Sequence, residues 1–149
     1  APIFIDPVST VKAEKLRGLL TRVHTLKPNR IEAELLSGVK ITDDESLCRA
    51  AQALIEQGVE RVFLSLGEGG VLAMQSDEMQ RVPICKAEMR NATGAGDAMM
   101  ASLVWSFLSG RTLAQSAAAG TAAAAIAVES EETINPAMSA EAVEKRLAH

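Results

Sequence analysis

The chain has 149 residues, of which 48% are hydrophobic, 23% charged and only 3% aromatic, and its formal net charge is −4. This composition is typical of a soluble globular domain, and the lack of a Lys/Arg-rich block argues against a nucleic-acid surface. The apolar stretches 98–108 and 117–128 are too short to cross a bilayer, and Cys48 and Cys85 lack metal-type spacing, so we expect a reduced, cytoplasmic protein with no membrane partner.

Short apolar runs alternate with segments of helical periodicity along the whole chain. The expected elements, in chain order, are a strand at 3–5, a helix at 11–23, a strand at 25–27, a helix at 29–37 ended by Gly38, a helix from Thr42 to Gly58 with a capping box over 42–45, a strand at 61–66, a glycine turn at 67–70, strands at 71–74 and 80–84, and helices at 96–108, 112–128 and 139–147. This alternation predicts an α/β fold with a largely parallel sheet.

Polar or glycine-rich loops follow several of the predicted strands. They are Asp6, the corner 27–29, the turn 65–70 and the loop 94–97. Ligands of parallel sheets bind at the carboxyl ends of the strands, where such loops meet. The sequence therefore predicts one site at this edge, with a nucleotide lying across it.

The loop before the helix at 96–108 has the composition of an anion site. Gly94, Ala95 and Gly96 precede Asp97, and the first N–H groups of a helix lack intrahelical partners, so they attract anions. A carboxylate would repel a phosphate that is merely held there, but a base that accepts a proton from an attacking hydroxyl belongs at such a place. The alternative is that Asp97 only caps the helix.

Three motifs in order resemble the ribokinase-like, or PfkB-type, carbohydrate kinases. Residues 91–98, Asn-Ala-Thr-Gly-Ala-Gly-Asp-Ala, are similar to the family signature Asp-Thr-x-Gly-Ala-Gly-Asp; residues 29–32 match its Asn-x-x-Glu segment, and residues 65–70 resemble its Thr-Leu-Gly-x-x-Gly strand end. Residues 6–9 and 24–30 look most like the pseudouridine kinase branch. The resemblance implies a three-layer ribokinase-like fold, in which residues 1–149 are the C-terminal nucleotide-binding and catalytic portion and the N-terminal substrate and lid portion is absent.

The resemblance also implies a function and a set of site residues. The function is ATP-dependent phosphorylation of a primary hydroxyl on a sugar or ribonucleoside, with Asp97 as the base and the amides of Gly94, Ala95 and Gly96 as the anion hole. Glu32 would lie on the Mg²⁺ side, usually through water. The residues expected at the nucleotide are Asn29, Ser65, Gly67, Gly70, Thr93, Thr121 and Ala124. There is no Walker A motif, so the phosphate site is of the amide-hole type.

Structural alternatives exist for these motifs. Asn29 and Glu32 have the spacing of a capping box, residues 67–70 also read as a plain glycine turn, and the Ala-rich segment 121–125 reads as a packed helix. Asn91 stands where the signature has an Asp, so a monovalent-cation requirement is left open, as is a homodimer formed through the missing lid. A catalytically inactive nucleotide-binding or regulatory module of the same fold is the alternative function.

Overall fold

The computed structural model describes residues 2–7, 9–76, 78–83 and 95–128, together with Val143 and Leu147. The chain divides into two compact units, one of Ala1–Gly67 and Val71–Arg81, the other of Glu68–Gly70 and Val82–His149. The predicted site residues Thr93 and Gly94 lie outside the described residues, as do Asn91 and most of the helix expected at 139–147.

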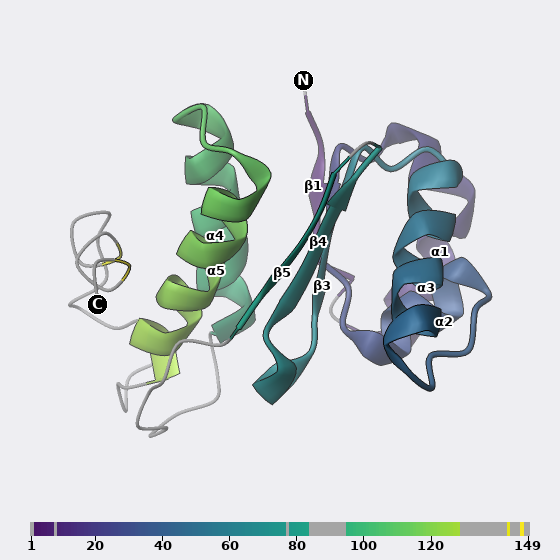
Figure 1. Ribbon diagram of the computed structural model, residues 1–149. Helices are drawn as coiled ribbons and strands as arrows, with labels where there is room; N and C mark the ends of the chain where they lie inside the picture. Colours follow the sequence, from purple (N-terminus) through teal and green to yellow (C-terminus); the bar gives the residue numbers. More distant parts are fainter. Residues whose placement is uncertain are drawn as a thin grey trace. The chain divides into compact units, whose positions relative to one another are not determined.

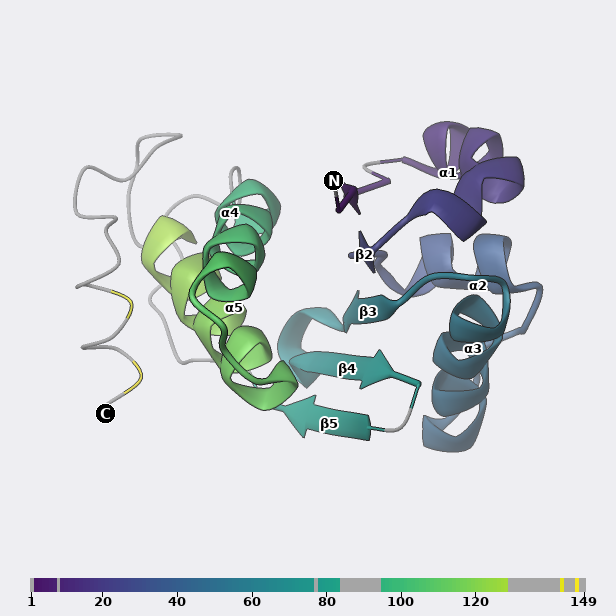
Figure 2. The ribbon, with the colours of Figure 1, turned by 90° about the horizontal axis from the view of Figure 1, so that it is seen from above.

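The first unit is built on a five-stranded sheet. Its strands are adjacent in the order of the sequence: β1 (Phe4–Ile5), β2 (Thr25–Leu26), β3 (Arg61–Ser65), β4 (Val71–Gln75) and β5 (Glu78–Val82). β1, β2 and β3 pair in parallel, whereas β4 is antiparallel to β3, and β5 runs back along β4 (Figure 2). The largely parallel arrangement expected from the sequence therefore holds for β1 to β3, and the complete sheet is mixed.

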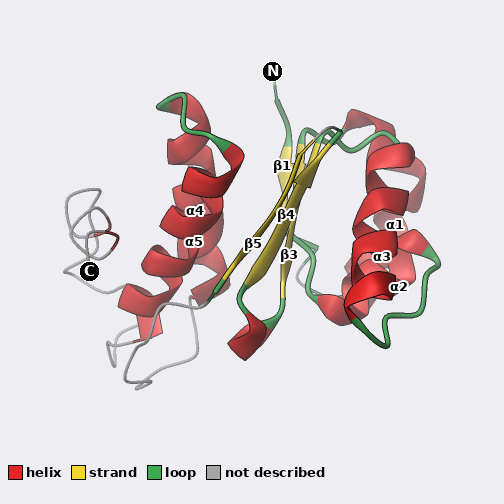
Figure 3. Cartoon of the chain, viewed as in Figure 1, coloured by secondary structure: helices red, strands yellow, loops and turns green. Residues whose placement is uncertain are grey.

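Three helices cover one face of this sheet (Figures 1 and 3). They are α1 (Thr10–Leu16), continued by the 3-10 helix η1 (Arg17–Arg22), then α2 (Arg30–Ser37) and α3 (Asp44–Glu56). Their apolar sides form a buried core with the side chains of the strands that point toward them, among which are Leu26, Val62, Leu64 and Leu72. Each strand–helix connection thus places its loop at the carboxyl end of a parallel strand.

The start of α3 differs from the prediction by one residue. The expected capping box of Thr42 with Glu45 is wrong, because Asp43 is the N-cap and Ser46 is its partner. The Ser46 N–H donates to Asp43 Oδ1 at 2.8 Å, and the Ser46 hydroxyl accepts from the Asp43 N–H at 3.0 Å and from the Thr42 N–H at 2.8 Å. A serine three residues after a carboxylate can satisfy more amides than Thr42 and Glu45 could, and this places the helix start one residue later.

The second unit contains two packed helices, α4 (Ala95–Leu108) and α5 (Leu113–Val128). Gly110, with φ 71°, lies in the turn between them, and α5 begins with a capping box in which the Thr112 N–H donates to Gln115 Oε1 at 2.9 Å. A Cβ on Gly120 would lie 3.1 Å from Met99 Cγ, so the two helices approach closely there. Ala98 and Trp105 of α4 pack against a buried cluster of Ala119, Ala122, Ala123, Ile126 and Val143.

Most of the expected elements are confirmed. The exceptions are small: residues 17–22 are 3-10 rather than α-helical, the glycine turn contains a short 3-10 helix, η2 (Gly67–Gly69), and β5 begins two residues earlier than expected. Within the described part of the chain, no helix is both long enough and apolar enough to cross a membrane.

Candidate active site

The corner after β2 lies beside the end of β3. Asn29 forms an isolated parallel bridge with Ser65, and the Ser65 N–H donates to the Pro28 carbonyl at 2.9 Å. The Ser65 hydroxyl also donates to that carbonyl, at 3.4 Å. Two of the predicted nucleotide residues, which are 36 positions apart in the sequence, are therefore neighbours at the carboxyl edge of the parallel strands.

Asn29 and Glu32 form a complete capping box at the start of α2. The Glu32 N–H donates to Asn29 Oδ1 at 2.8 Å, and the Asn29 N–H donates to Glu32 Oε1 at 3.0 Å. The Glu32 side chain is buried, with the residue only 3% exposed. The capping box that the sequence offered as the alternative explanation of Asn29 and Glu32 is therefore present. It uses one carboxylate oxygen of Glu32 and leaves the second outside the box.

That arrangement bears on whether Glu32 suits Mg²⁺. Mg²⁺ commonly keeps several waters and takes one or two carboxylates in addition to the phosphates of its substrate. Among the residues that the structure describes, no group of three or more His, Cys, Asp or Glu side chains lies together as a metal site. A single carboxylate with one free oxygen suits an Mg²⁺ ion that is held mainly by the phosphates of the substrate and contacts the protein through water. It does not suit a site built entirely of protein ligands.

An ion pair that the sequence motifs did not assign lies next to this corner. Lys27 follows β2 directly and Asp6 follows β1, and the distance from Lys27 Nζ to Asp6 Oδ2 is 3.2 Å. Lys27 is 6% exposed, and its backbone N–H donates to the Ile5 carbonyl at 3.0 Å. The sequence placed both residues at strand ends, but their pairing depends on the register of β1 against β2, which no motif indicates.

The surroundings of the two predicted glycines in the turn after β3 differ. Both have positive φ angles, 58° for Gly67 and 83° for Gly70. A Cβ on Gly67 would meet no described atom within 4 Å, whereas a Cβ on Gly70 would overlap the Val82 carbonyl oxygen. Chain packing is therefore sufficient to require glycine at position 70, while the described residues leave the space beside Gly67 open to another molecule.

In the second unit, Ala95, Gly96 and Asp97 form the first turn of α4, and Asp97 is exposed. Because α5 runs back along α4, with Gly120 against Met99, the segment 121–124 lies toward the same end of this helix pair. Thr121 is buried, and its hydroxyl donates to the Ala118 carbonyl of its own helix at 2.8 Å. Helix packing therefore accounts for Thr121, and only its neighbour Ala124 is partly exposed.

Shifted pKa values are found away from the Asn29–Ser65 corner. Burial lowers the pKa of His24 and that of Arg61, at the amino ends of β2 and β3, and hydrogen bonds from Ser46 lower the pKa of Asp43. These shifts have local causes in packing and capping. They do not mark a second catalytic centre.

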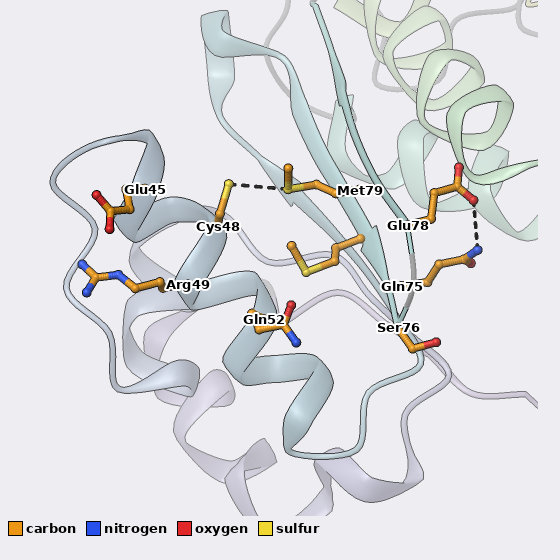
Figure 4. Close-up of a pocket in the computed structure, with 9 residues that line it drawn as sticks. Glu45, Cys48, Arg49, Gln52, Gln75, Ser76, Glu78 and Met79 are labelled. Carbon is orange, nitrogen blue, oxygen red and sulfur yellow. Dashed lines mark hydrogen bonds between the residues drawn. The ribbon is translucent and has the colours of Figure 1, made fainter.

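A hollow of about 640 Å³ lies between α3 and the β4–β5 hairpin (Figure 4). Cys48 of α3 and Met79 of β5 face one another across it, with their sulfur atoms 3.5 Å apart. Gln75, at the end of β4, is paired with Arg61 at the start of β3, so the hollow lies at the opposite end of β3 from Ser65. None of the predicted site residues lines it.

Comparison with known proteins identifies the family of the chain. The model of the pfkB family carbohydrate kinases matches residues 1–140. The chain is 39% identical over 140 residues to the pseudouridine kinase of Escherichia coli (strain K12), covering 93% of this chain and 44% of that protein.

Solved structures with a similar fold include sugar kinases. A putative sugar kinase from Clostridium perfringens has a TM-score of 0.94 and 31% identity, with 99% of this chain and 46% of that chain covered. Ribokinase from Thermotoga maritima has a TM-score of 0.84 and 28% identity, with 100% and 50% covered. The chain thus spans half or less of each of these relatives. With the family model covering nearly all of its residues and its strands and helices superposing on ribokinase, the chain belongs to the pfkB family of carbohydrate kinases and has the ribokinase-like α/β fold.

Proposed function

We propose that this chain is the nucleotide-binding and catalytic portion of an ATP-dependent kinase whose substrate and lid portion precedes it in a longer polypeptide. The acceptor is a primary hydroxyl of a sugar or ribonucleoside. Pseudouridine is the first candidate, because the similarity to pseudouridine kinase extends over 93% of the chain. The observation that carries the proposal is the meeting of Asn29 with Ser65 at the carboxyl edge of the parallel strands.

The proposed reaction is a direct in-line transfer. The acceptor oxygen forms a bond to the γ-phosphorus while the bond from that phosphorus to the β–γ bridging oxygen breaks, and ADP leaves. Asp97 accepts the proton of the attacking hydroxyl, a role that suits an exposed carboxylate in the first turn of α4. The amides of Gly94, Ala95 and Gly96 donate to the charge that develops on the transferred group, and one such preorganised donor is worth about 3 to 4 kcal/mol.

The remaining residues bind and orient the nucleotide. Asn29, Ser65 and the open side of Gly67 form the surface proposed for its phosphates. Thr93 is proposed to bind the nucleotide, and Ala124 to contact its base. Glu32 would hold Mg²⁺ through water by the oxygen that the capping box leaves over. The bound ion would neutralise the nucleotide phosphates during transfer.

The test is a coupled ADP-release assay on the whole polypeptide that carries this sequence. Pseudouridine, inosine, adenosine, ribose and fructose are offered in turn, and native protein is compared with Asp97→Asn. We expect one acceptor to stimulate ADP release, and the variant to lose at least about 100-fold in kcat while its ATP affinity stays within a few-fold. If no acceptor stimulates release, or if the variant is as active as native protein, the proposed mechanism is wrong.

A binding or regulatory module that has lost catalysis is the competing function. The presence of Asp97 speaks against it, because a carboxylate beside bound phosphate weakens simple binding. In that case Asp97→Asn would tighten nucleotide binding, and no acceptor would be phosphorylated.

A further inference from the structure

The hollow between α3 and the β4–β5 hairpin brings together three sulfur-containing side chains that the proposed kinase reaction does not use. Cys48 of α3, Met74 of β4 and Met79 of β5 all line it. The sulfur atoms of Cys48 and Met79 face one another at 3.5 Å (Figure 4). Met74 and Met79 are each the second residue of their strand counted from the hairpin turn, so both thioethers come from the same stretch of the hairpin.

Packing explains only part of this arrangement. Met74 is 5% exposed and belongs to the buried core of the first unit, against which Cys48 packs. Met79, in contrast, is 51% exposed, so burial accounts for little of its position. Cys48 is a free cysteine and is itself partly exposed. An ion that enters the hollow from solvent can therefore reach the sulfur atoms of both Cys48 and Met79.

The chemistry of these side chains selects the kind of ion. Thiolate and thioether sulfur atoms are soft ligands, which favour Cu(I) over hard cations such as Mg²⁺. A zinc–thiolate bond is about 2.3 Å long, and with a similar length for Cu(I) two sulfur atoms that share a three-coordinate ion lie about 4 Å apart. The separation of 3.5 Å needs to open by only about half an ångström, which the flexible side chain of an exposed methionine permits.

The charged residues around the hollow also suit a cation. Glu45 and Glu78 line it together with a single cationic side chain, that of Arg49, among the residues that the structure describes. The lining therefore carries more negative than positive charge. This charge attracts a positive ion toward the sulfur atoms.

We propose that Cys48, Met74 and Met79 form a binding site for one Cu(I) ion. The Cys48 thiol releases its proton to water and binds the ion as a thiolate, and the two thioethers complete a three-coordinate sulfur site. The bound ion links α3 to the β4–β5 hairpin and so stabilises the first unit. Because the hollow lies at the opposite end of β3 from Ser65, the inference does not depend on the proposed kinase reaction.

The test is an anaerobic Cu(I) titration of the whole polypeptide, with the chromogenic chelator bicinchoninate as competitor and no nucleotide present. Native protein is compared with Cys48→Ser, Met79→Leu and the matched thiol control Cys85→Ser. Leucine has nearly the volume of methionine, so Met79→Leu removes the thioether and keeps the packing. We expect native protein and Cys85→Ser to bind one more Cu(I) ion than Cys48→Ser does, and Cu(I) to raise the melting temperature of native protein but not that of Cys48→Ser.

Met79→Leu separates a built sulfur site from a thiol that binds copper unaided. Partners outside the ligand shell of a metal already contribute about 10- to 100-fold to its affinity, so the loss of a ligand should weaken Cu(I) binding by at least about tenfold. Unchanged Cu(I) affinity in Met79→Leu would overturn the inference, as would equal copper binding by native protein and Cys48→Ser or an equal loss in Cys85→Ser. If Cys48→Ser does not fold, the comparison of Met79→Leu with native protein decides.

Discussion

The substitution Glu32→Gln separates the two roles that this residue can have. Glutamine keeps a side-chain oxygen that accepts from the Asn29 N–H, which lies 3.0 Å from Glu32 Oε1 in the native protein, and glutamine can take the place of glutamate in a capping box. The Glu32 N–H that donates to Asn29 at 2.8 Å belongs to the backbone and is retained. We therefore expect the free energy of unfolding to fall by less than the loss of a cap would cost, which is about 1 kcal/mol.

The charge, in contrast, is lost completely. A carboxylate that orients a metal through water typically contributes about 10- to 100-fold to metal affinity or activity. Glu32→Gln should therefore lower kcat/KM by about that factor, and the Mg²⁺ concentration needed for half-maximal rate should rise. The assay is ADP release at saturating acceptor with Mg²⁺ titrated, beside urea unfolding of the same preparation.

Ser46→Ala is the matched control, because it breaks the corresponding box at the start of α3, away from the proposed site. It should destabilise by about 1 to 2 kcal/mol, since the amides of Thr42 and Asp43 both lose their acceptor. When it is assayed well below its melting temperature, its kcat/KM should stay within twofold of that of native protein. If Glu32→Gln behaves like this control, with full activity and an unchanged Mg²⁺ titration, Glu32 is a cap and nothing more.

Three further outcomes are expected from the described structure. Gly70→Ala should destabilise by more than about 2 kcal/mol in urea unfolding because its Cβ would overlap the Val82 carbonyl, whereas Gly67→Ala should cost only the left-handed backbone, about 1 to 2 kcal/mol; equal costs would contradict the contrast. Burial lowers the pKa of His24 from 6.5, so the unfolded chain binds the proton more readily, and the melting temperature should fall as pH drops below about 6.5, with a shallower fall in His24→Gln. Leu54→Ala, at a fully buried position, should cost about 2 to 5 kcal/mol, and a cost below 1 kcal/mol would show that the core of the first unit is packed differently.

The sequence predicted the elements well because most have local signals. The Asn29 side chain caps the start of α2, and Gly38 ends the helix in a left-handed conformation. Pro28 ends β2. The start of α3 was misassigned because Thr42, Asp43 and Asp44 can all cap a helix, and only the contacts of Ser46 decide between them. The antiparallel pairing of β4 with β3 follows from the short glycine turn between them, a length too small for a crossover helix.

The list of site residues stays a prediction, and the structure bears only on how some of these residues are arranged. The bridge between Asn29 and Ser65 follows from parallel strands that end at one edge, which the alternation of strands and helices already indicated. The pairing of Asp6 with Lys27 required the register of β1 on β2, a property of the folded sheet. The roles proposed for the site residues, Asp97 and Glu32 included, all stay predictions.

The residues at the starts of α2 and α4 differ in whether their side chains can accept hydrogen bonds from the first amides of the helix. This difference bears on where an anion binds. Every helix begins with amides that lack intrahelical acceptors. At α2 the chain satisfies its own amides, because Asn29 Oδ1 accepts from the Glu32 N–H and Glu32 Oε1 accepts from the Asn29 N–H. α4 begins with Ala95 and Gly96, which Gly94 precedes in the sequence, and none of these three residues has a side-chain acceptor. At α2 an external anion would therefore have to displace an internal hydrogen bond, whereas the side chains of Gly94, Ala95 and Gly96 offer no such acceptor at α4. This difference supports the proposed role of the α4 amides as hydrogen-bond donors to the transferred phosphoryl group.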